Sequence, residues 1–319
     1  GTTLTYASAA LTTTTSFRLQ PTDTYCSPDQ VVYTNTVTVT VHSQLTAGTA
    51  TANQTICYGE TPSTLSAIAP TGGSGMFAYQ WQLSTDGGTN WTNVPAAGTL
   101  LTYSPPALLQ STHYRLQQTD TYCSPPQSVY SNTVVITVHG QMQAGTATAN
   151  QTICYGEIPT AISATLPTGG SGSYTYQWQY STDGGASYSN VATAGTSLIY
   201  APGALTQTTQ YRLQETDTYC TPHQIVNTNA VTITVHGQLQ AGTATADQTL
   251  CNGETPAILT STAPTGGSGT FTYQWQYSTN GGSSWANVAS GGTTLTYASA
   301  ALTTTTSFRL QQTDTYCSP

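Results

Sequence analysis

Large apolar side chains alternate with polar or small ones in several short stretches of the chain. In Phe77–Ser84, with the sequence FAYQWQLS, every second side chain is aromatic or aliphatic. A period of two is typical of a strand that turns one face to the core. The same alternation returns in residues 174–181 and 271–278. We therefore expect three aromatic-rich strands, each with its large side chains facing inward.

Turn signals divide the sequence between these strands. Asp86-Gly87-Gly88 follows the first aromatic strand and can supply the positive backbone dihedrals of a tight hairpin. A calcium loop is disfavoured there, because one carboxylate offers too few oxygen ligands and Asn280 replaces the aspartate in a later copy. Strands are predicted at residues 47–56, 63–69, 76–85, 90–95, 99–104, 112–122 and 132–139. Seven short strands at about ten-residue spacing predict a two-sheet sandwich of the immunoglobulin or fibronectin type III kind.

The whole pattern repeats every 97 residues without insertion or deletion. The central tryptophans Trp81, Trp178 and Trp275 are 97 residues apart, and we expect them to be structural core residues. A unit of this length can bury its own core, so the fold class is all-β, in tandem sandwich domains that do not share cores. The predicted domains are a half-repeat at 1–46, a first full repeat at 47–143, a second full repeat at 144–240, and a C-terminal repeat at 241–319 that lacks its last strand.

A tyrosine spacing supports the sandwich interpretation. Leu108, Thr112 and Tyr114 have the L-x-x-x-T-x-Y spacing that resembles the tyrosine corner of fibronectin type III domains, and Tyr211 occupies the same position one repeat later. In those domains the phenol ties a loop to nearby backbone. The C-terminal repeat has Phe308 at this position, so there the side chain can only pack.

Composition narrows the choice of partners. Charged residues make up 5% of the chain, against roughly 25% in ordinary soluble domains. The four basic residues are all arginine, at positions 18, 115, 212 and 309, and the net charge is -8. Nucleic acids and anionic lipid surfaces are excluded as partners, because both need clusters of cations. The chain contains no run of about 20 apolar residues, so no membrane-spanning segment is predicted.

Five short strings resemble a known family: Gln54–Cys57, Thr71–Gly75, Tyr79–Gln82, Ser84–Gly88, and the closing Ser131-Asn132 with Thr137-Val138. Together they are similar to the immunoglobulin-like tandem repeats of giant surface proteins from gliding and filamentous bacteria of the Bacteroidota type, including grappling-hook filaments. That resemblance implies export to the cell surface, commonly by the type 9 route, and an adhesive or filament-forming role. It identifies a scaffold and not a ligand.

The seven cysteines are expected to be oxidised in an exported chain. Analogy with immunoglobulin domains gives bridges within each repeat. These would be Cys57–Cys123, Cys154–Cys220 and Cys251–Cys317.

Counting along the strands favours bridges between repeats. Cys57 lies at the end of the domain where the repeat ends, whereas Cys123 closes the sixth strand, roughly 30 Å away at about 3.3 Å per residue. A disulfide requires Cα atoms within about 7 Å. The predicted bridges are therefore Cys57–Cys220 and Cys154–Cys317, and partners for Cys26, Cys123 and Cys251 are expected beyond this sequence or in a neighbouring chain.

No catalytic, cofactor-binding or metal-binding residues are predicted. No histidine recurs beside a recurring acid, and the junction histidines His42, His139 and His236 have no evident co-ligands, so solvated linker positions are favoured for them. A carbohydrate-binding array is the alternative function, and it needs exposed rings at Trp91 and Trp285.

The favoured function is a structural stalk or filament segment of an extracellular adhesin. Its partners would be copies of itself in a homo-oligomeric fibre, and a surface receptor or glycan at a distant tip. The outward faces carry amides and hydroxyls, including Gln80, Gln82 and Gln117, which can pair with a copy of themselves without stranding charge. The same faces fit a merely solvated surface equally well.

Overall fold

The computed structural model describes residues 3–25 and 27–317. Within these ranges the chain forms β-strands and no helix, which confirms the predicted all-β fold. It divides into two compact units, one made of residues 1–141 with 169–171 and the other of residues 142–168 with 172–319. The first unit therefore holds the half-repeat and the first full repeat, and the second unit holds nearly all of the other two repeats.

The half-repeat contributes four short strands in two antiparallel pairs. β1 (Thr15–Phe17) pairs with β4 (Val37–Val39), and β2 (Thr22–Asp23) pairs with β3 (Gln30–Val31). None of the described side chains up to residue 44 is buried. This segment has no core of its own.

The first full repeat is a two-layer sandwich of eight strands, counted over residues 47–143, all of which are described. They are β5 (Gln54–Cys57), β6 (Leu65–Ser66), β7 (Phe77–Ser84), β8 (Thr92–Asn93), β9 (Thr102–Tyr103), β10 (Thr112–Asp120), β11 (Gln127–Tyr130) and β12 (Val134–Gln143). One sheet has the order β5-β12-β10-β7-β8, with β5 parallel to β12 and β11 paired to β10. The other layer is the β6–β9 pair. This arrangement is that of immunoglobulin-like and fibronectin type III-like sandwiches, as predicted.

The core lies between the two layers and is centred on Trp81, which is 0% exposed. Its ring stacks on Tyr103 of β9 with the ring centroids 6.4 Å apart, and its indole N–H donates to a backbone carbonyl oxygen at 3.0 Å. Leu116 on β10 and Ile136 on β12 belong to the same cluster. Every second residue of β10 is buried, so the period of two in the sequence becomes a one-sided core.

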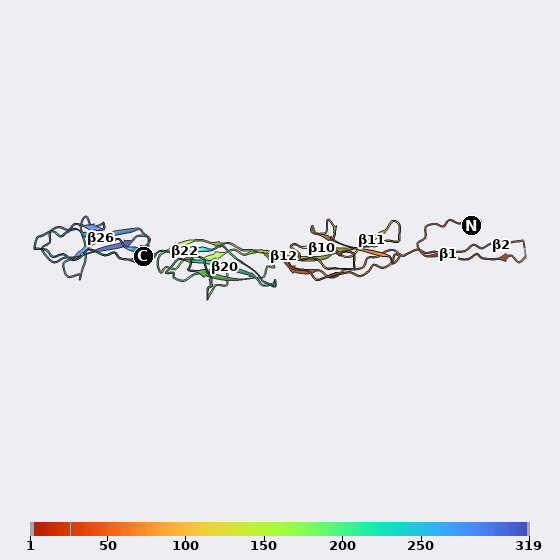
Figure 1. The fold of residues 1–319 in the computed structure, drawn as a ribbon, viewed down its shortest axis with the longest axis horizontal. Helices are drawn as coiled ribbons and strands as arrows, with labels where there is room; N and C mark the ends of the chain where they lie inside the picture. Colours follow the sequence, from red (N-terminus) through yellow and green to blue (C-terminus); the bar gives the residue numbers. More distant parts are fainter. Residues whose placement is uncertain (1–2, 26, 318–319) are drawn as a thin grey trace. The chain divides into compact units, whose positions relative to one another are not determined.

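The second full repeat has the same topology. Its strands are β13 (Ala147–Thr148), β14 (Gln151–Ile153), β15 (Ile162–Ala164), β16 (Thr168–Gly170), β17 (Tyr174–Ser181), β18 (Ser189–Asn190), β19 (Ile199–Tyr200), β20 (Thr209–Asp217), β21 (Gln224–Asn227), β22 (Val231–Val235) and β23 (Gly237–Gln240). One sheet runs β14-β22-β20-β17-β18, and the second layer is β13-β15-β19. Figure 1 draws β20 and β22 side by side, in keeping with their antiparallel register. Trp178 is 0% exposed at the centre of this core.

The C-terminal repeat is less closed. Its strands are β24 (Leu259–Thr260), β25 (Thr265–Gly267), β26 (Phe271–Ser278), β27 (Ala286–Asn287), β28 (Thr296–Tyr297) and β29 (Ser307–Asp314). The sheet has the order β27-β26-β29, β24 pairs with β28, and β25 pairs with β23. Trp275 is still only 1% exposed, but Phe308 is partly exposed, whereas its counterpart Tyr114 is buried.

Two details of the predicted strands are wrong. The segment 47–56 was expected to be one strand, but it divides between the layers, because Ala50 bridges to Ala67 whereas β5 pairs with β12 in the other sheet. The predicted count of seven also omits β11, which forms a hairpin with the end of β10 after Pro125-Pro126.

Candidate functional site at a repeat junction

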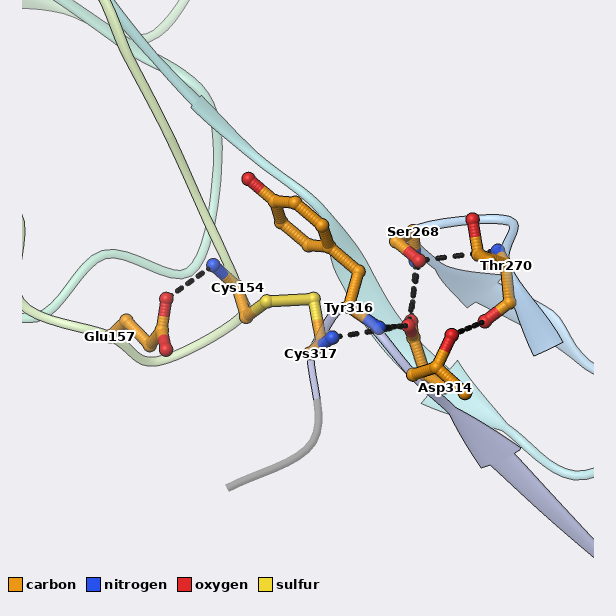
Figure 2. Close-up of a disulfide and its surroundings, with 8 residues drawn as sticks. Cys154, Glu157, Ser268, Thr270, Asp314, Tyr316 and Cys317 are labelled. Carbon is orange, nitrogen blue, oxygen red and sulfur yellow. Dashed lines mark hydrogen bonds between the residues drawn. A yellow bond between two sulfur atoms is a disulfide. The ribbon is translucent and has the colours of Figure 1, made fainter. Parts of the chain in front are cut away.

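A disulfide joins the second full repeat to the C-terminal repeat. Cys154 follows β14, Cys317 follows β29, and their Cα atoms are 5.5 Å apart although 163 residues separate them in sequence. Both cysteines belong to the second compact unit. Figure 2 shows the bridge between the two chain segments, with Glu157 beside one half and Asp314 beside the other. The structure thus contains one of the two bridges that strand counting predicts.

The bridges expected within repeats are wrong. Cys154 is bonded to Cys317, which rules out its pairing with Cys220, and both Cys123 and Cys251 are free. The physical reason is that the two cysteines of one sandwich lie at opposite ends of its strands. Cys57 and Cys220 are each disulfide-bonded. Their predicted mutual pairing stays a prediction, as do the external partners of Cys123 and Cys251, and Cys26 lies outside the described residues.

A glutamate three residues later holds the backbone of Cys154. The Cys154 N–H donates to Glu157 Oε2 at 2.7 Å, and the Glu157 N–H donates back to the Cys154 carbonyl oxygen at 3.1 Å. Between them Gly156 has a φ of 82°, a left-handed conformation that favours glycine. The same side-chain contact recurs at Cys57 with Glu60 and at Cys251 with Glu254. The turn after Cys57 is expected from its sequence, but the contact of the glutamate with the cysteine N–H was not predicted, although the recurring Cys-x-x-Glu spacing could have revealed it.

Asp314 holds the other half of the bridge. Its Oδ1 accepts from the Cys317 N–H at 3.1 Å, the Tyr316 N–H at 3.0 Å and the Ser268 hydroxyl at 2.6 Å. The Ser268 hydroxyl is the main cause that lowers the pKa of Asp314 to about 2, and the backbone N–H donors add to it. The buried carboxylate therefore stays ionised and fixes the chain just before Cys317. Asp120 and Ser74 make the same contact in the first full repeat.

Two of the junction histidines, His42 and His236, contact tyrosine rings. His236 meets Tyr316 edge-on, with ring centroids 5.3 Å apart, and in the first unit His42 meets Tyr122 in the same way at 5.4 Å. The His42 charge also contributes to a lowered pKa at Asp120, after the larger effect of Ser74. The prediction that these histidines are merely solvated linker residues is therefore incomplete. His42 is exposed, but its ring has a defined partner in the next repeat.

The tyrosine-corner residues are buried, but they pack instead of tying a loop. Tyr114 and Tyr211 are 1% and 4% exposed, and their rings lie against Tyr103 and Tyr200 with centroids 5.9 and 5.7 Å apart. Across residues 3–25 and 27–317, neither of the two phenols is seen to hydrogen-bond to backbone, and only burial and neighbouring tyrosines act on their hydroxyls. Burial raises the pKa of both hydroxyls to about 12. The predicted positions hold, whereas the hydrogen bond implied by the fibronectin resemblance does not form.

On the outward face, the arginines cover aromatic rings. Arg115 lies 4.2 Å from the Trp91 ring centroid and 4.0 Å from that of Tyr130, and its Nε–H donates to Gln82 Oε1 at 2.9 Å. Similar stacks recur in the other repeats, and they are Arg18 on Tyr33, Arg212 on Tyr188 and Arg309 on Trp285. Trp91 is half-buried with one ring face occupied. The covered face is closed to a sugar, so the carbohydrate alternative gains no support from this contact.

The Asp86 turn is held by its own hydrogen bonds. The Asp86 carboxylate accepts from the backbone N–H groups of Asn90 and Thr89 and from the Ser84 hydroxyl. The Asn90 backbone donor is the largest cause that lowers the pKa of Asp86 to about 2. In the C-terminal repeat Asn280 accepts from the Ser284 N–H in the same geometry. A neutral amide thus serves the turn equally well, which is the behaviour of a structural turn.

Two further properties of residues 3–25 and 27–317 bear on the chemistry that the chain can perform. Within it, no group of three or more histidine, cysteine, aspartate or glutamate side chains could hold a metal ion. No helix in the same residues has the length and apolar character to cross a membrane.

A family profile described as a domain of unknown function, DUF8696, matches residues 46–140, 143–237 and 240–319. The chain belongs to the DUF8696 family. Each DUF8696 match starts one residue before a predicted repeat, so the family defines the same tandem unit as the 97-residue period. No curated protein matches the sequence.

Several solved structures resemble the DUF8696 chain at low identity. The three N-terminal domains of the bacteriophage RB49 Highly Immunogenic Outer Capsid protein are 14% identical, with a TM-score of 0.34 and coverage of 83% of this chain and 86% of that one. The FN1–FN3 domains of chicken CNTN1 are 11% identical, with a TM-score of 0.33 and coverage of 84% and 92%. A three-domain titin segment is 14% identical, with a TM-score of 0.27 and the same coverage.

Proposed function

We propose that this DUF8696 chain is a non-enzymatic structural segment of an extracellular stalk or filament. The observation that supports this most directly is the Cys154–Cys317 bridge, which links one repeat to the next instead of closing a repeat on itself. A bridge inside a domain protects only that domain. A bridge between domains limits bending at the junction and transmits tension past it.

The disulfides also favour a location outside the cell. Disulfides persist in oxidising compartments and are rare in the reducing cytosol. Four of the described cysteines are disulfide-bonded. Uniform repetition adds length, since an active site would need only one copy. These features support a repeat adhesin whose binding function lies in another part of the protein.

The finer proposal is a surface adhesin of the Bacteroidota type, exported by the type 9 route and able to associate laterally with copies of itself. The sequence resemblance supports the surface role. The nearly uncharged outer faces support self-association, because amides and hydroxyls pair without stranding charge. Charged residues make up only 5% of the chain, which leaves few charges to repel a parallel copy.

Single-molecule stretching of the chain from its two ends tests the load-bearing role of the bridge. The bridge encloses 163 residues, which an extended chain would lengthen by about 55 nm at about 3.4 Å per residue. We expect this length to stay hidden from the force under oxidising conditions and to appear after a reductant is added. Cys154→Ser should release it without reductant. Equal extension with and without reductant would show that the bridge bears no load and would contradict the proposal.

A further inference from the structure

One position of the repeat carries an amide side chain in two repeats and a carboxyl side chain in the third. Gln118, Glu215 and Gln312 are 97 residues apart, on β10, β20 and β29. Gln118 and Glu215 are each 0% exposed. Two repeats therefore place an amide where the second full repeat places a carboxyl group.

The amides tie two backbone segments together. Gln118 Oε1 accepts from the Gly48 N–H at 2.8 Å, and Gln118 Nε2 donates to the Ile68 carbonyl oxygen at 2.8 Å. Gln312 repeats both contacts, with the Gly242 N–H at 2.7 Å and the Thr262 carbonyl oxygen at 2.8 Å. The side chain at this position must therefore accept one hydrogen bond from the start of the repeat. It must also donate one to the segment that follows the second strand of the repeat.

Glu215 satisfies only half of this requirement when ionised. Its Oε2 accepts from the Gly145 N–H at 2.8 Å, while its buried Oε1 has no hydrogen-bond partner among the described residues. The equivalent carbonyl is that of Thr165. A Cβ built on Gly145 would lie 2.0 Å from the Thr165 carbonyl oxygen and 3.0 Å from Glu215 Oε1, so both oxygens lie beside this glycine. Both are acceptors unless the carboxyl group carries a proton.

We propose that Glu215 is a pH-sensitive lock in the second full repeat. In its protonated form, the Oε1–H donates to the Thr165 carbonyl oxygen and closes the contact that the amides close in the other repeats. When the proton leaves to solvent, Glu215 Oε1 can no longer donate to the Thr165 carbonyl oxygen, and this contact between the side chain and the segment around Thr165 is lost.

The surroundings offer the ionised form little support. Tyr176 lies opposite Glu215 on β17, and Val226 lies opposite it on β21. Asp217, a second carboxyl group, is two residues further along the same buried face of β20. The segments 144–148 and 162–166 contain no titratable side chain. Burial raises the pKa of Glu215, opposed by the Gly145 N–H, and the pKa of Tyr176 is raised by burial and by the Glu215 charge.

The sign of the pH effect follows from a raised pKa in the folded state. The stabilisation is complete below the ordinary carboxyl value of about 4.3 and is lost as the pH rises through the higher pKa of the folded repeat. The first strand of the second full repeat should therefore loosen toward neutral pH. The other two repeats, with amides at this position, should show no such change.

Hydrogen exchange of the full chain, followed segment by segment between pH 4 and pH 8, tests this lock. After correction for intrinsic exchange rates, protection of residues 145–148 should fall with rising pH, by about tenfold for each unit by which the pKa is raised. Glu215→Gln should keep these residues protected throughout. Gln118→Glu should transfer the pH dependence to residues 48–51 of the first full repeat.

A carboxyl-carbon NMR titration of Glu215 provides the second measurement. We expect its midpoint well above the ordinary glutamate range. A midpoint in the ordinary range, or the same pH dependence of protection in the wild-type chain and in Glu215→Gln, would overturn the proposal. The Gln118→Glu variant keeps the test decisive if Glu215→Gln changes the folding of its own repeat.

Discussion

The interior of each repeat and the junction after it are built from different interactions. Trp81, Trp178 and Trp275 sit in the same buried position, and each donates its indole N–H to a carbonyl oxygen of its own repeat. At the junction of the second full repeat with the C-terminal repeat, the defining contacts cross between repeats, as in Cys154–Cys317 and the His236–Tyr316 ring pair. Each hydrophobic core is therefore local to a repeat, while the contacts that link successive repeats lie at the junction.

Removing the bridge should have the largest effect. In the chain-entropy view, a closed loop of 163 residues contributes about 5 kcal/mol, so Cys154→Ser should lower the combined free energy of unfolding of the two linked repeats by about that amount. Chemical denaturation measures it. Cys251→Ser is the matched control, because Cys251 is free. Equal losses of unfolding free energy in Cys154→Ser and Cys251→Ser would show that the bridge contributes no stability of its own.

Deleting a core tryptophan should affect one repeat only. Trp178→Ala is expected to lower the stability of the second full repeat by about 3–5 kcal/mol, the usual range for a buried large aromatic side chain. Differential scanning calorimetry should show one transition moving down while the others stay in place. Trp285→Ala, at a half-buried ring, should cost less. A single earlier transition for the whole chain would refute the independence of the repeats.

Acid should loosen the junction through Asp314. Its pKa of about 2 lies below the ordinary aspartate value of about 3.9, so its stabilisation is present above pH 4 and is lost as the pH falls toward 2. Ser268→Ala removes the main donor and should raise the pKa of Asp314 toward the ordinary value. A carboxyl-carbon NMR titration checks this, with Ser74→Ala as the control that acts on Asp120. An unchanged Asp314 titration in Ser268→Ala would show that the hydroxyl is not the cause.

The smallest effect is expected on the outward face. Arg115→Ala removes two cation–π contacts at a partly exposed site, each worth about 0.5–1 kcal/mol. Chemical denaturation of the first full repeat should detect the loss. Gln117→Ala, on the same face, removes no cation and should change stability less. A larger loss for Gln117→Ala than for Arg115→Ala would argue against the stacks as a source of stability.

The sequence predicted the features that depend on periodicity. Alternation identified the strand around Trp81 and the burial of its inward face, and counting along strands placed Cys154 and Cys317 at facing ends of successive repeats. Periodicity could not show that residues 47–56 change sheets, because both layers accept the same alternation. It also missed β11, which is short and follows two prolines.

Polar contacts were harder to predict, because they depend on three-dimensional neighbours. Glu157 and Asp314 hold the two cysteines through backbone N–H groups, and such partners leave no hydrophobic pattern. Glu215 stands where the other repeats have Gln118 and Gln312, a difference that by itself predicts no contact. Its significance comes from the Thr165 carbonyl, which no spacing in the sequence places beside it.

Non-reducing peptide mapping tests most directly the claim that disulfides join successive repeats. The account predicts one linked pair that contains Cys154 with Cys317 and another that contains Cys57 with Cys220. A Cys154 peptide linked to Cys220, or a Cys57 peptide linked to Cys123, would return each bridge to its own repeat and contradict the account.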